Sequence, residues 1–327
     1  MPPVLVCPDA FKGTLRAAQV AAAIGRGLES AGLEPPDLCP IADGGEGTME
    51  VLLTALGGDT AGATVADPLG RPVSAGFALI EDGSTAIVEV AQASGLHLVA
   101  EGERDPEAAS TRGTGELICA AVAAGADVVL VAAGGSATTD GGAGAIAAIE
   151  EAGGLGGAAL VVLCDVQTRF EDAAAQFGPQ KGADAAATNR LSGRLAALAG
   201  TLPRDPRGQP MTGAAGGLSG GLWAVFGAHL EPGAAFVLDA LDFDERLRGA
   251  QAMITGEGRI DATTLAGKAV AEAAVRARQA GVPAHAIAGS SDLDILGQRA
   301  LDLQTIRTAT TPAELEAAAE ALALLLR

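Results

Sequence analysis

Buried-strand patterns and helical patterns alternate along the first sixty residues. The apolar run VLVC at 4–7 predicts a short buried strand, and apolar residues then repeat at helical spacing over 20–28, behind a candidate N-cap at Thr14. The run DLCPI at 37–41 predicts a second strand, and Thr48 is placed to cap the helix that follows it. This part of the chain therefore predicts one unit of strand, helix, strand and helix.

The same alternation returns near the other end of the chain. Short apolar runs at 252–255, 284–289 and 303–306 alternate with helical patterns around 265–280 and 313–326. Together with the first two strands, these runs make five strands joined by helical connections. Such alternation is typical of an α/β fold with a parallel, doubly wound sheet.

The middle of the chain has a different pattern of apolar runs and turns. Strand-like runs and turns between residues 60 and 90 indicate an antiparallel meander. We therefore expect a discontinuous first domain of residues 1–57 and 245–327, with residues 58–244 inserted as a second α/β domain. A chain of 327 residues that is 49% apolar can bury two medium-sized cores, which agrees with this split.

The chain is strongly acidic, with a net charge of −19 and a pI near 4.4. Such a charge repels nucleic acid backbones and anionic lipid surfaces, so we expect neither nucleic acid nor membrane as a partner. One apolar segment, 117–135, imitates a membrane span, but Gly125 and Asp127 divide it into a short helix and a strand. We expect a monomer or a homodimer that acts on a small-molecule substrate.

The cysteines and the first residues indicate a cytoplasmic protein. Four cysteines lie far apart and form neither a CxxC pair nor a zinc-type cluster: Cys7, Cys39, Cys119 and Cys164. They fit buried thiols in a reducing compartment. The first residues, MPPVLVCPDAFKG, have no basic region, and their apolar run is too short for a signal peptide.

Glycine-rich polar loops follow most of the predicted strands. They include DAFKGT, ADGGEGT, TGEGRID and AGSS in the outer segments, and AAGGSATTDGGAG and FGPQKG in the middle. Because parallel strands present their carboxyl ends at one edge of a sheet, we expect these loops to form the site.

Neither of the two standard phosphate-binding motifs, GxxxxGK(S/T) and GxGxxG, fits these loops well. The only GK pair, Gly267 and Lys268, is followed by Ala269, and residues 142–147 merely approximate GxGxxG.

Glycines in these loops predict close contact with phosphate, because backbone N–H groups can surround phosphate oxygens where no side chain intervenes. Asp43 and Glu46 would repel a bare phosphate but fit a magnesium ion that accompanies it. An Asx turn at Asp43 and a capping role for Glu46 are the structural alternatives. The candidate phosphate- or nucleotide-binding residues are Gly44, Gly45, Gly47, Gly256, Gly258 and Lys268.

Lysine is rare, and each lysine adjoins a glycine. Lys12, Lys181 and Lys268 occur in FKG, QKG and GKA, whereas arginine supplies every other basic side chain. A compact ammonium is favoured where a bulky guanidinium does not fit. Chance and turn composition can produce the same pattern, so both interpretations stay open.

Six ordered motifs resemble those of the glycerate kinase family usually called type I: PDAFKGTL, PIADGGEGT, GTGELI, GGSATTDGGAG, FGPQKGA and TGEGRID. The resemblance covers nearly the whole chain. It implies transfer of the γ-phosphate of ATP, with Mg²⁺, to D-glycerate, generally at the 2-hydroxyl. It also implies a flavodoxin-like parallel-sheet domain with an inserted α/β domain that has a restriction-endonuclease-like core.

The chain departs from the family's usual motifs in three places. Thr139 stands where the family usually has asparagine, and Gln167 follows CDV where the family commonly continues with Asn-Pro. The segment between Glu151 and Leu160 is shorter than the family's. These departures concern the fit of the substrate and the geometry of the insert.

Candidate roles follow from the residue types and the resemblance. Asp43 could hold magnesium or accept the hydroxyl proton, and Lys12 could neutralise the transferring phosphoryl group; with Asp165 these are the catalytic candidates. Arg112 could pair with the glycerate carboxylate. For each of these residues, a role in a turn, a helix cap or the solvated surface is the alternative to the functional role. The candidate substrate-binding residues are Arg112, Ser136, Thr138 and Asp140.

The sequence leaves two other functions open. A dinucleotide-dependent oxidoreductase of a small hydroxy acid would change the absorbance of a nicotinamide cofactor. A catalytically lapsed protein would bind glycerate or a nucleotide without turnover. The sequence also leaves open whether the product is 2- or 3-phosphoglycerate, and which carboxylate is base and which is metal ligand.

Overall fold

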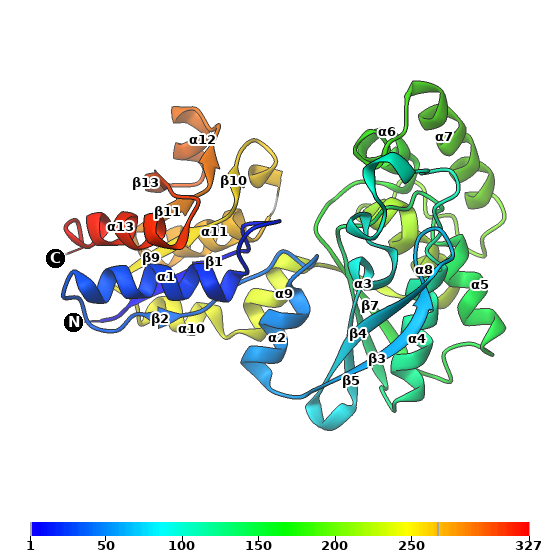
Figure 1. Ribbon diagram of the computed structural model, residues 1–327, viewed down its shortest axis with the longest axis horizontal. Coiled ribbons are helices and arrows are strands. Elements are labelled where there is room, and N and C mark those ends of the chain that lie inside the picture. The colour runs from blue at the N-terminus through cyan, green and yellow to red at the C-terminus, as the bar shows by residue number, and fades with distance from the viewer. Residues whose placement is uncertain (1, 267, 327) are drawn as a thin grey trace. The chain divides into compact units, whose positions relative to one another are not determined.

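The computed structural model describes residues 2–266 and 268–326, and it divides into two compact units. The first unit comprises the chain up to Asp43 and from Ala234 onward, and the second comprises Gly44–Gly233. Each unit combines parallel strands with helices, so the fold is mixed α/β (Figure 1). Gly267 of the GK pair lies outside the described residues.

The first unit is built on a five-stranded parallel sheet in the order β13, β11, β9, β1, β2. Every residue of β1, β9 and β11 is buried, because helices cover both faces of the sheet. The parallel sheet predicted from the alternating pattern is confirmed. Its strands are β1 (Val4–Pro8), β2 (Asp37–Leu38), β9 (Ala252–Gly256), β11 (Ala284–Ala288) and β13 (Leu303–Thr308).

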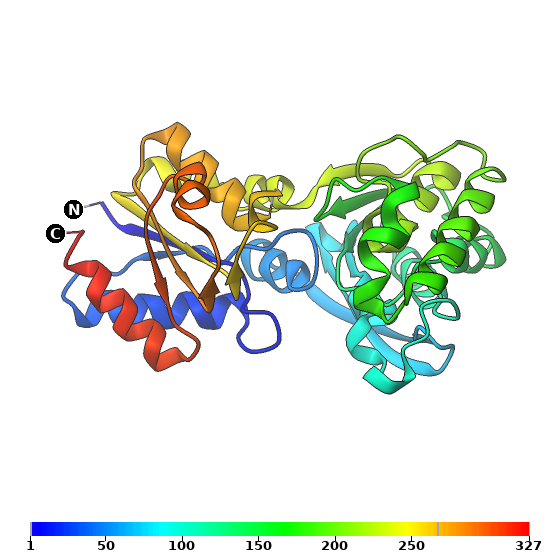
Figure 2. The same cartoon turned by 90° about the horizontal axis from the view of Figure 1, so that it is seen from above.

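Helices α1 (Ala17–Ser30) and α13 (Pro312–Ala323) run side by side along one face of this sheet. The yellow and orange helices α10 and α11 lie on the other side of the strands (Figure 2). The remaining elements of the unit are α9 (Gly233–Ala240), α10 (Phe243–Arg248), α11 (Ala269–Ala280), α12 (Ile295–Ala300) and the short parallel pair β10 (Arg259–Ile260) and β12 (Ser290–Ser291).

The second unit has a six-stranded sheet in the chain order β3 to β8. Its first three strands pair antiparallel, as the meander pattern predicts, and β5 to β8 pair in parallel. The strands are β3 (Asp59–Ala66), β4 (Pro72–Ile80), β5 (Thr85–Glu89), β6 (Val128–Ala133), β7 (Ala159–Cys164) and β8 (His229–Pro232). The helices are α2 (Thr48–Leu56), α3 (Val90–Ser94), α4 (Arg112–Ala123), α5 (Ala143–Glu151), α6 (Ala173–Phe177), α7 (Ala185–Ala199) and α8 (Leu218–Phe226).

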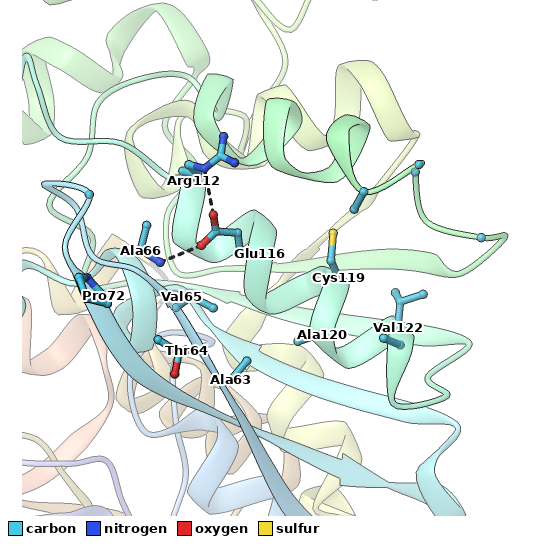
Figure 3. Close-up of a pocket in the computed structure, with 16 residues that line it drawn as sticks. Ala63, Thr64, Val65, Ala66, Pro72, Arg112, Glu116, Cys119, Ala120 and Val122 are labelled. Carbon is cyan, nitrogen blue, oxygen red and sulfur yellow. Dashed lines mark hydrogen bonds and ion pairs between the residues drawn. The ribbon is translucent and has the colours of Figure 1, made fainter.

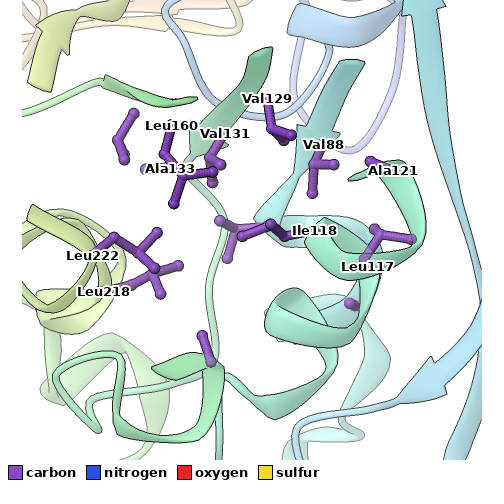
Figure 4. Close-up of a cluster of buried hydrophobic side chains, with 14 of the residues drawn as sticks. Val88, Leu117, Ile118, Ala121, Val129, Val131, Ala133, Leu160, Leu218 and Leu222 are labelled. Atoms are coloured by element: carbon purple, nitrogen blue, oxygen red, sulfur yellow. The ribbon is translucent and has the colours of Figure 1, made fainter. Parts of the chain in front are cut away.

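The core of the second unit lies between this sheet and its helices. Ile118 of α4 and Leu222 of α8 pack with Val88 of β5 and Val131 of β6 (Figure 4). All four side chains are fully buried, and each such side chain contributes roughly 1.5–3 kcal/mol of transfer free energy. This packing fixes the carboxyl ends of β5 and β6, after which α3 and the glycine-rich loop 134–142 begin.

The segment 117–135, which imitates a membrane span, forms the end of α4 and strand β6, as its glycine and aspartate predict. Among the described residues, no helix is long and apolar enough to cross a membrane. The four cysteines are free thiols, and all but Cys119 are buried.

Two expected N-caps are wrong. Helix α1 begins at Ala17 behind Arg16, and the Thr14 hydroxyl instead donates to the Phe11 carbonyl, 2.8 Å away. Thr48 is the first helical residue of α2, and the N-cap is Gly47, whose φ of 96° lies in the left-handed region. A glycine reaches that conformation without the steric cost that threonine would meet.

Helix α2 belongs to the second unit because it packs against β4 and β5. The boundaries expected from the sequence, after residues 57 and 244, assign this helix to the first domain. The connections between the compact units instead follow Asp43 and Gly233. The division of the chain into independently folding domains stays a prediction.

Candidate active site

Three buried carboxylates gather at the carboxyl edge of the first unit's sheet. Asp9 follows β1 directly, Glu257 follows β9 directly, and Asp43 lies in the loop between β2 and α2. All three are at most 6% exposed. Parallel strands place their carboxyl ends at the same edge, so loops from different parts of the sequence meet here. These residues are called the carboxylate cluster below.

Burial and neighbouring negative charge raise the pKa of two members of this cluster, Asp9 and Glu257. Burial raises the pKa of Asp9 well above its usual range, and the neighbouring charges of Asp43 and Glu257 raise it further. Burial also raises the pKa of Glu257, while hydrogen bonds from Thr264 and Lys268 oppose that effect. Buried like charges of this kind are common where a cation or a proton is to be bound.

Two of the three lysines lie beside this cluster. Lys12 Nζ is 3.1 Å from Asp43 Oδ2, and Lys268 Nζ is 3.5 Å from Glu257 Oε2. The Lys12 side chain is half exposed, so its head can also reach a ligand in solution. Glu257 additionally accepts a 2.7 Å hydrogen bond from the Thr264 hydroxyl.

A pocket of about 500 Å³ opens at this edge of the first unit. Its volume lies within the usual range for small-molecule sites. Asp261 stands at the pocket in an Asx turn, accepting from the Thr263 amide at 2.8 Å. The residues that line it include Asp9, Lys12, Glu257, Gly258, Asp261, Lys268 and Ser290.

The glycines expected to bind phosphate at this edge differ in what requires them. A Cβ on Gly256 would lie 1.9 Å from the Ile287 carbonyl oxygen, so the close approach of β9 and β11 demands glycine there. A Cβ on Gly258 would lie 3.3 Å from Phe11 Cα, a tight but relievable contact, and Gly258 lines the pocket. Of these two glycines, Gly258 is therefore the one positioned for a ligand.

In the second unit, a protein carboxylate occupies the glycine loop that begins α2. The amides of Gly47 and Met49 each donate to Glu89 Oε1, at 2.9 Å. Glu89 is buried, and burial raises its pKa while these two hydrogen bonds lower it. A phosphate at this helix N-terminus would have to displace Glu89. The start of α2 thus binds a carboxylate, which Glu89 of β5 supplies.

The rest of this loop packs backbone against backbone. A Cβ on Gly44, whose φ is 91°, would lie 2.5 Å from Gly233 Cα, and a Cβ on Gly134 would lie 2.6 Å from Gly45 Cα. Gly44 and Gly45 therefore have structural reasons to be glycine. Glu46 is exposed, with its carboxylate near Gly135.

The expected metal ligands Asp43 and Glu46 fall on opposite sides of the division between units. Across residues 2–266 and 268–326, no three or more His, Cys, Asp or Glu side chains form a metal-binding group. Magnesium commonly binds through one or two carboxylates plus phosphate oxygens, so a dedicated protein cage is not required.

Both carboxylate oxygens of Asp140 accept hydrogen bonds from the protein. Its Oδ2 accepts from the Thr111 amide at 2.8 Å, the Thr111 hydroxyl at 2.9 Å and the Gly144 amide at 3.2 Å. Its Oδ1 accepts from the Gly142 amide at 3.1 Å. Asp140 thus ties the start of α5 to the start of α4, which fits the cap role better than substrate binding.

We expect Asp140→Asn to lower the free energy of unfolding by about 1–3 kcal/mol, because an amide group must then face a backbone donor. Urea unfolding followed by circular dichroism measures this change. The exposed Asp127, changed to asparagine, is the control and should stay within about 0.5 kcal/mol of the wild type. Unchanged stability together with weakened substrate binding would restore the substrate-binding interpretation of Asp140.

Lys181, named among the rare lysines but not among the expected site residues, follows α6, and its buried side chain contacts the loop after β6. Its Nζ donates to Ser136 Oγ at 2.9 Å and to the Thr138 carbonyl at 2.5 Å. Burial lowers its pKa to about 8, although the charges of Asp140 and Asp165 act in the opposite direction. Lys181, Ser136 and Asp165 line a pocket of about 240 Å³.

The structure does not bring Arg112 into that pocket. Arg112 is the first residue of α4, and its guanidinium pairs with Glu116 at 2.9 Å and with Glu151 at 2.6 Å. It lines a different groove, of about 950 Å³, against β3 (Figure 3). Two protein carboxylates already neutralise this guanidinium.

Comparison with known proteins gives consistent matches over most of the chain. The chain fits the Glycerate kinase family model over residues 4–153 and 150–327. It is 40% identical to a glycerate kinase from Bacillus subtilis (strain 168), over 89% of this chain and 86% of that protein. It is 36% identical to a glycerate 2-kinase from Escherichia coli (strain K12), over 91% of this chain and 88% of that protein.

A solved structure shares the fold. The crystal structure of a protein named glycerate kinase 2 from Salmonella typhimurium LT2 superimposes with a TM-score of 0.81 at 34% sequence identity. The match covers 99% of this chain and 98% of that one. Both compact units are therefore included in the likeness.

Proposed function

Since the chain belongs to the glycerate kinase family and is a kinase, we propose that it transfers the γ-phosphoryl group of ATP to the 2-hydroxyl of D-glycerate. The product would be 2-phosphoglycerate. The observation that carries the proposal is the carboxylate cluster with Lys12 and Lys268 beside it. Acidic oxygens and compact cations at the carboxyl edge of a parallel sheet are the groups that phosphoryl transfer requires.

We propose that the nucleotide binds in the first unit's pocket together with Mg²⁺. Asp9, Asp43 and Glu257 would repel the phosphates of ATP if no divalent cation came with them. An all-oxygen donor set suits magnesium, and Asp43 would hold it. Mg²⁺ held there would supply positive charge that offsets the charge developing on the transferring phosphoryl group. Lys268 and the backbone at Gly258 would contact the phosphates.

The same proposal assigns roles to the remaining catalytic candidates. Lys12 would approach the transferring phosphoryl group, because its half-exposed head already lies at Asp43. Asp43 would alternatively accept the hydroxyl proton if the metal is held otherwise. Asp165, which follows β7 and lines the second unit's pocket, is the other candidate for the base.

We also propose that the first unit has a flavodoxin-like fold. Taken in chain order, the strands of the first unit's sheet are arranged 2-1-3-4-5, the flavodoxin-like order. The restriction-endonuclease-like core of the second unit is proposed from the resemblance of the motifs. The parallel half of its sheet, β5 to β8, is compatible with an α/β core.

The test is to incubate the pure protein with ATP, magnesium and D-glycerate and to identify the product by phosphorus NMR. We expect the resonance of 2-phosphoglycerate, absent when magnesium is chelated. A 3-phosphoglycerate resonance would change the assigned hydroxyl, and binding without turnover would indicate a lapsed enzyme. The structure gives the oxidoreductase alternative no support, because the Gly142 amide of the approximate GxGxxG donates to Asp140.

A further inference from the structure

A buried lysine in the second unit has only neutral acceptors. Lys181 is 3% exposed, and its ammonium donates to the Ser136 hydroxyl and the Thr138 carbonyl. An ammonium has three N–H donors, so one remains after these two bonds. Within the described parts of the chain, no carboxylate lies within 4.0 Å of its nitrogen.

Keeping a cation at this place is costly to the fold. Burial of an ammonium without a paired anion is among the most unfavourable arrangements in a protein interior. The lowered pKa of Lys181 expresses this cost, which Asp140 and Asp165 reduce at longer range. A fold that needed only a packing residue here would be better served by an apolar side chain. The arrangement therefore suggests an anion that arrives from outside.

The pocket beside Lys181 suits a short, polar molecule. Its volume is about 240 Å³, and Ser136, Asp165 and Gln180 stand in its wall with the backbone of Gly134 and Gly135. Leu96 and Phe177 supply apolar surface. Such a space is large enough for a three-carbon hydroxy acid.

The polar wall is held rigidly. The Leu96 amide donates to the Gly135 carbonyl at 2.8 Å, and the Ala137 amide donates to the Ser94 carbonyl at 2.8 Å. A Cβ on Gly216 would lie 2.0 Å from the Thr138 carbonyl oxygen, so the close packing of these two backbone segments requires glycine there. Rigid support of this kind spares the ordering entropy of binding.

We propose that Lys181 and Ser136 bind the carboxylate group of the substrate, a short-chain hydroxy acid, in the second unit's pocket. The lysine would give its third N–H to one carboxylate oxygen. Ser136 accepts from Lys181 with its oxygen, so its own proton is left to donate to the other carboxylate oxygen. A charge-assisted contact of this kind takes the place that the sequence assigned to Arg112. The proposal rests on the proposed function.

Lys181→Met tests the charge while keeping an unbranched side chain. We expect the Kd for D-glycerate, measured by calorimetry without nucleotide, to rise by roughly 10- to 100-fold. The KM for glycerate should rise in parallel, while the KM for ATP stays within about twofold. Arg190→Met, which removes an exposed cation paired with Glu107, is the matched control and should leave both constants unchanged.

A neutral substrate analogue isolates the carboxylate. The wild type should prefer D-glycerate to D-glyceramide, its neutral amide, by at least tenfold in kcat/KM, and Lys181→Met should lose most of this preference. A variant that retains the full preference overturns the proposal. If the wild type neither binds nor phosphorylates glycerate, the proposed function fails independently of Lys181.

Ionisation of the lysine gives a second readout. Because its pKa is lowered to about 8, with Asp140 and Asp165 as the nearby charged groups, Lys181 loses its charge as the pH rises through that value. The kcat/KM for glycerate should therefore fall above about pH 8 in the wild type but not in Lys181→Met. Should that variant fail to fold, Ser136→Ala retains the lysine and should still weaken glycerate binding by roughly 3- to 10-fold; unaltered binding would contradict the proposal.

Discussion

Replacing Asp43 by asparagine is expected to lower kcat by about 10²- to 10⁴-fold while the protein stays folded. Asparagine keeps the size and turn propensity of aspartate but removes the charge that faces Lys12 and crowds Asp9. Both proposed roles, metal ligand and proton acceptor, need the negative charge. Steady-state kinetics with ATP, magnesium and D-glycerate measures the loss, and thermal unfolding confirms the fold.

A magnesium titration separates the two roles of Asp43. If the carboxylate holds the metal, high magnesium should restore part of the lost rate, because mass action compensates for a weaker site. If it accepts the hydroxyl proton, the deficit should stay flat across the titration. Asp302→Asn is the control, since Asp302 is exposed and its φ of 54° suits asparagine.

A purely structural role for Asp43 predicts a different pair of results. Asp43→Asn would then show near-normal activity, and Asp43→Ala would shift the melting temperature because the turn loses its acceptor. That outcome would move the search for the base to Asp165. It would leave the family membership untouched.

The layout of the first unit's sheet was predictable because its information is local. Apolar runs such as VLVC specify a strand buried on both faces, and their alternation with helical periods specifies parallel pairing. The predicted runs at 252–255 and 303–306 lie inside the observed β9 and β13. In the middle segment, the switch to an antiparallel meander was likewise readable from its turns.

Helix starts were predicted less well because their capping partners come from elsewhere. The Gly47 and Met49 amides at the start of α2 bond to Glu89, 42 and 40 residues further along the chain, and not to Thr48. Thr48 Oγ1 is buried and without a hydrogen-bond partner in the described structure. The local sequence shows a threonine before an apolar run, but it does not show that Glu89 of β5 supplies the carboxylate that accepts from these amides.

The roles of the candidate site residues were equally hard to predict, because most of their partners also come from distant parts of the chain. Asp140 and Arg112 have the chemistry of substrate ligands in the sequence, but the fold supplies each with partners: Thr111 for the first, Glu116 and Glu151 for the second. Lys181 carried a usable signal, since it is one of three lysines and adjoins a glycine. Its burial, which gives that signal its meaning, appears only in three dimensions.

The second large effect is expected at Lys12. Lys12→Ala should lower kcat by about 10²- to 10³-fold, because a compact cation near the transferring phosphoryl group offsets charge that develops in the transition state. Its half-exposed side chain makes only a modest contribution to stability, so the melting temperature should change far less than the rate.

Lys268 is the matched comparison for Lys12, because it is the other lysine beside the carboxylate cluster. Lys268 pairs with Glu257, and its removal should raise the KM for ATP with a smaller effect on kcat, as expected for binding that is uniform between ground and transition states. The two variants therefore differ in which kinetic constant they change. Lys12→Arg adds a test of shape, since a guanidinium keeps the charge but not the compact geometry.

Three results would contradict this assignment. Unchanged kcat in Lys12→Ala would make Lys12 a solvated turn residue, the alternative that the sequence left open. A rise in the KM for ATP without loss of kcat would move Lys12 to the role assigned to Lys268. Full activity in Lys12→Arg would show that charge alone is sufficient, and the restriction of lysine to glycine-flanked positions would then need an explanation other than compactness at the reacting phosphate.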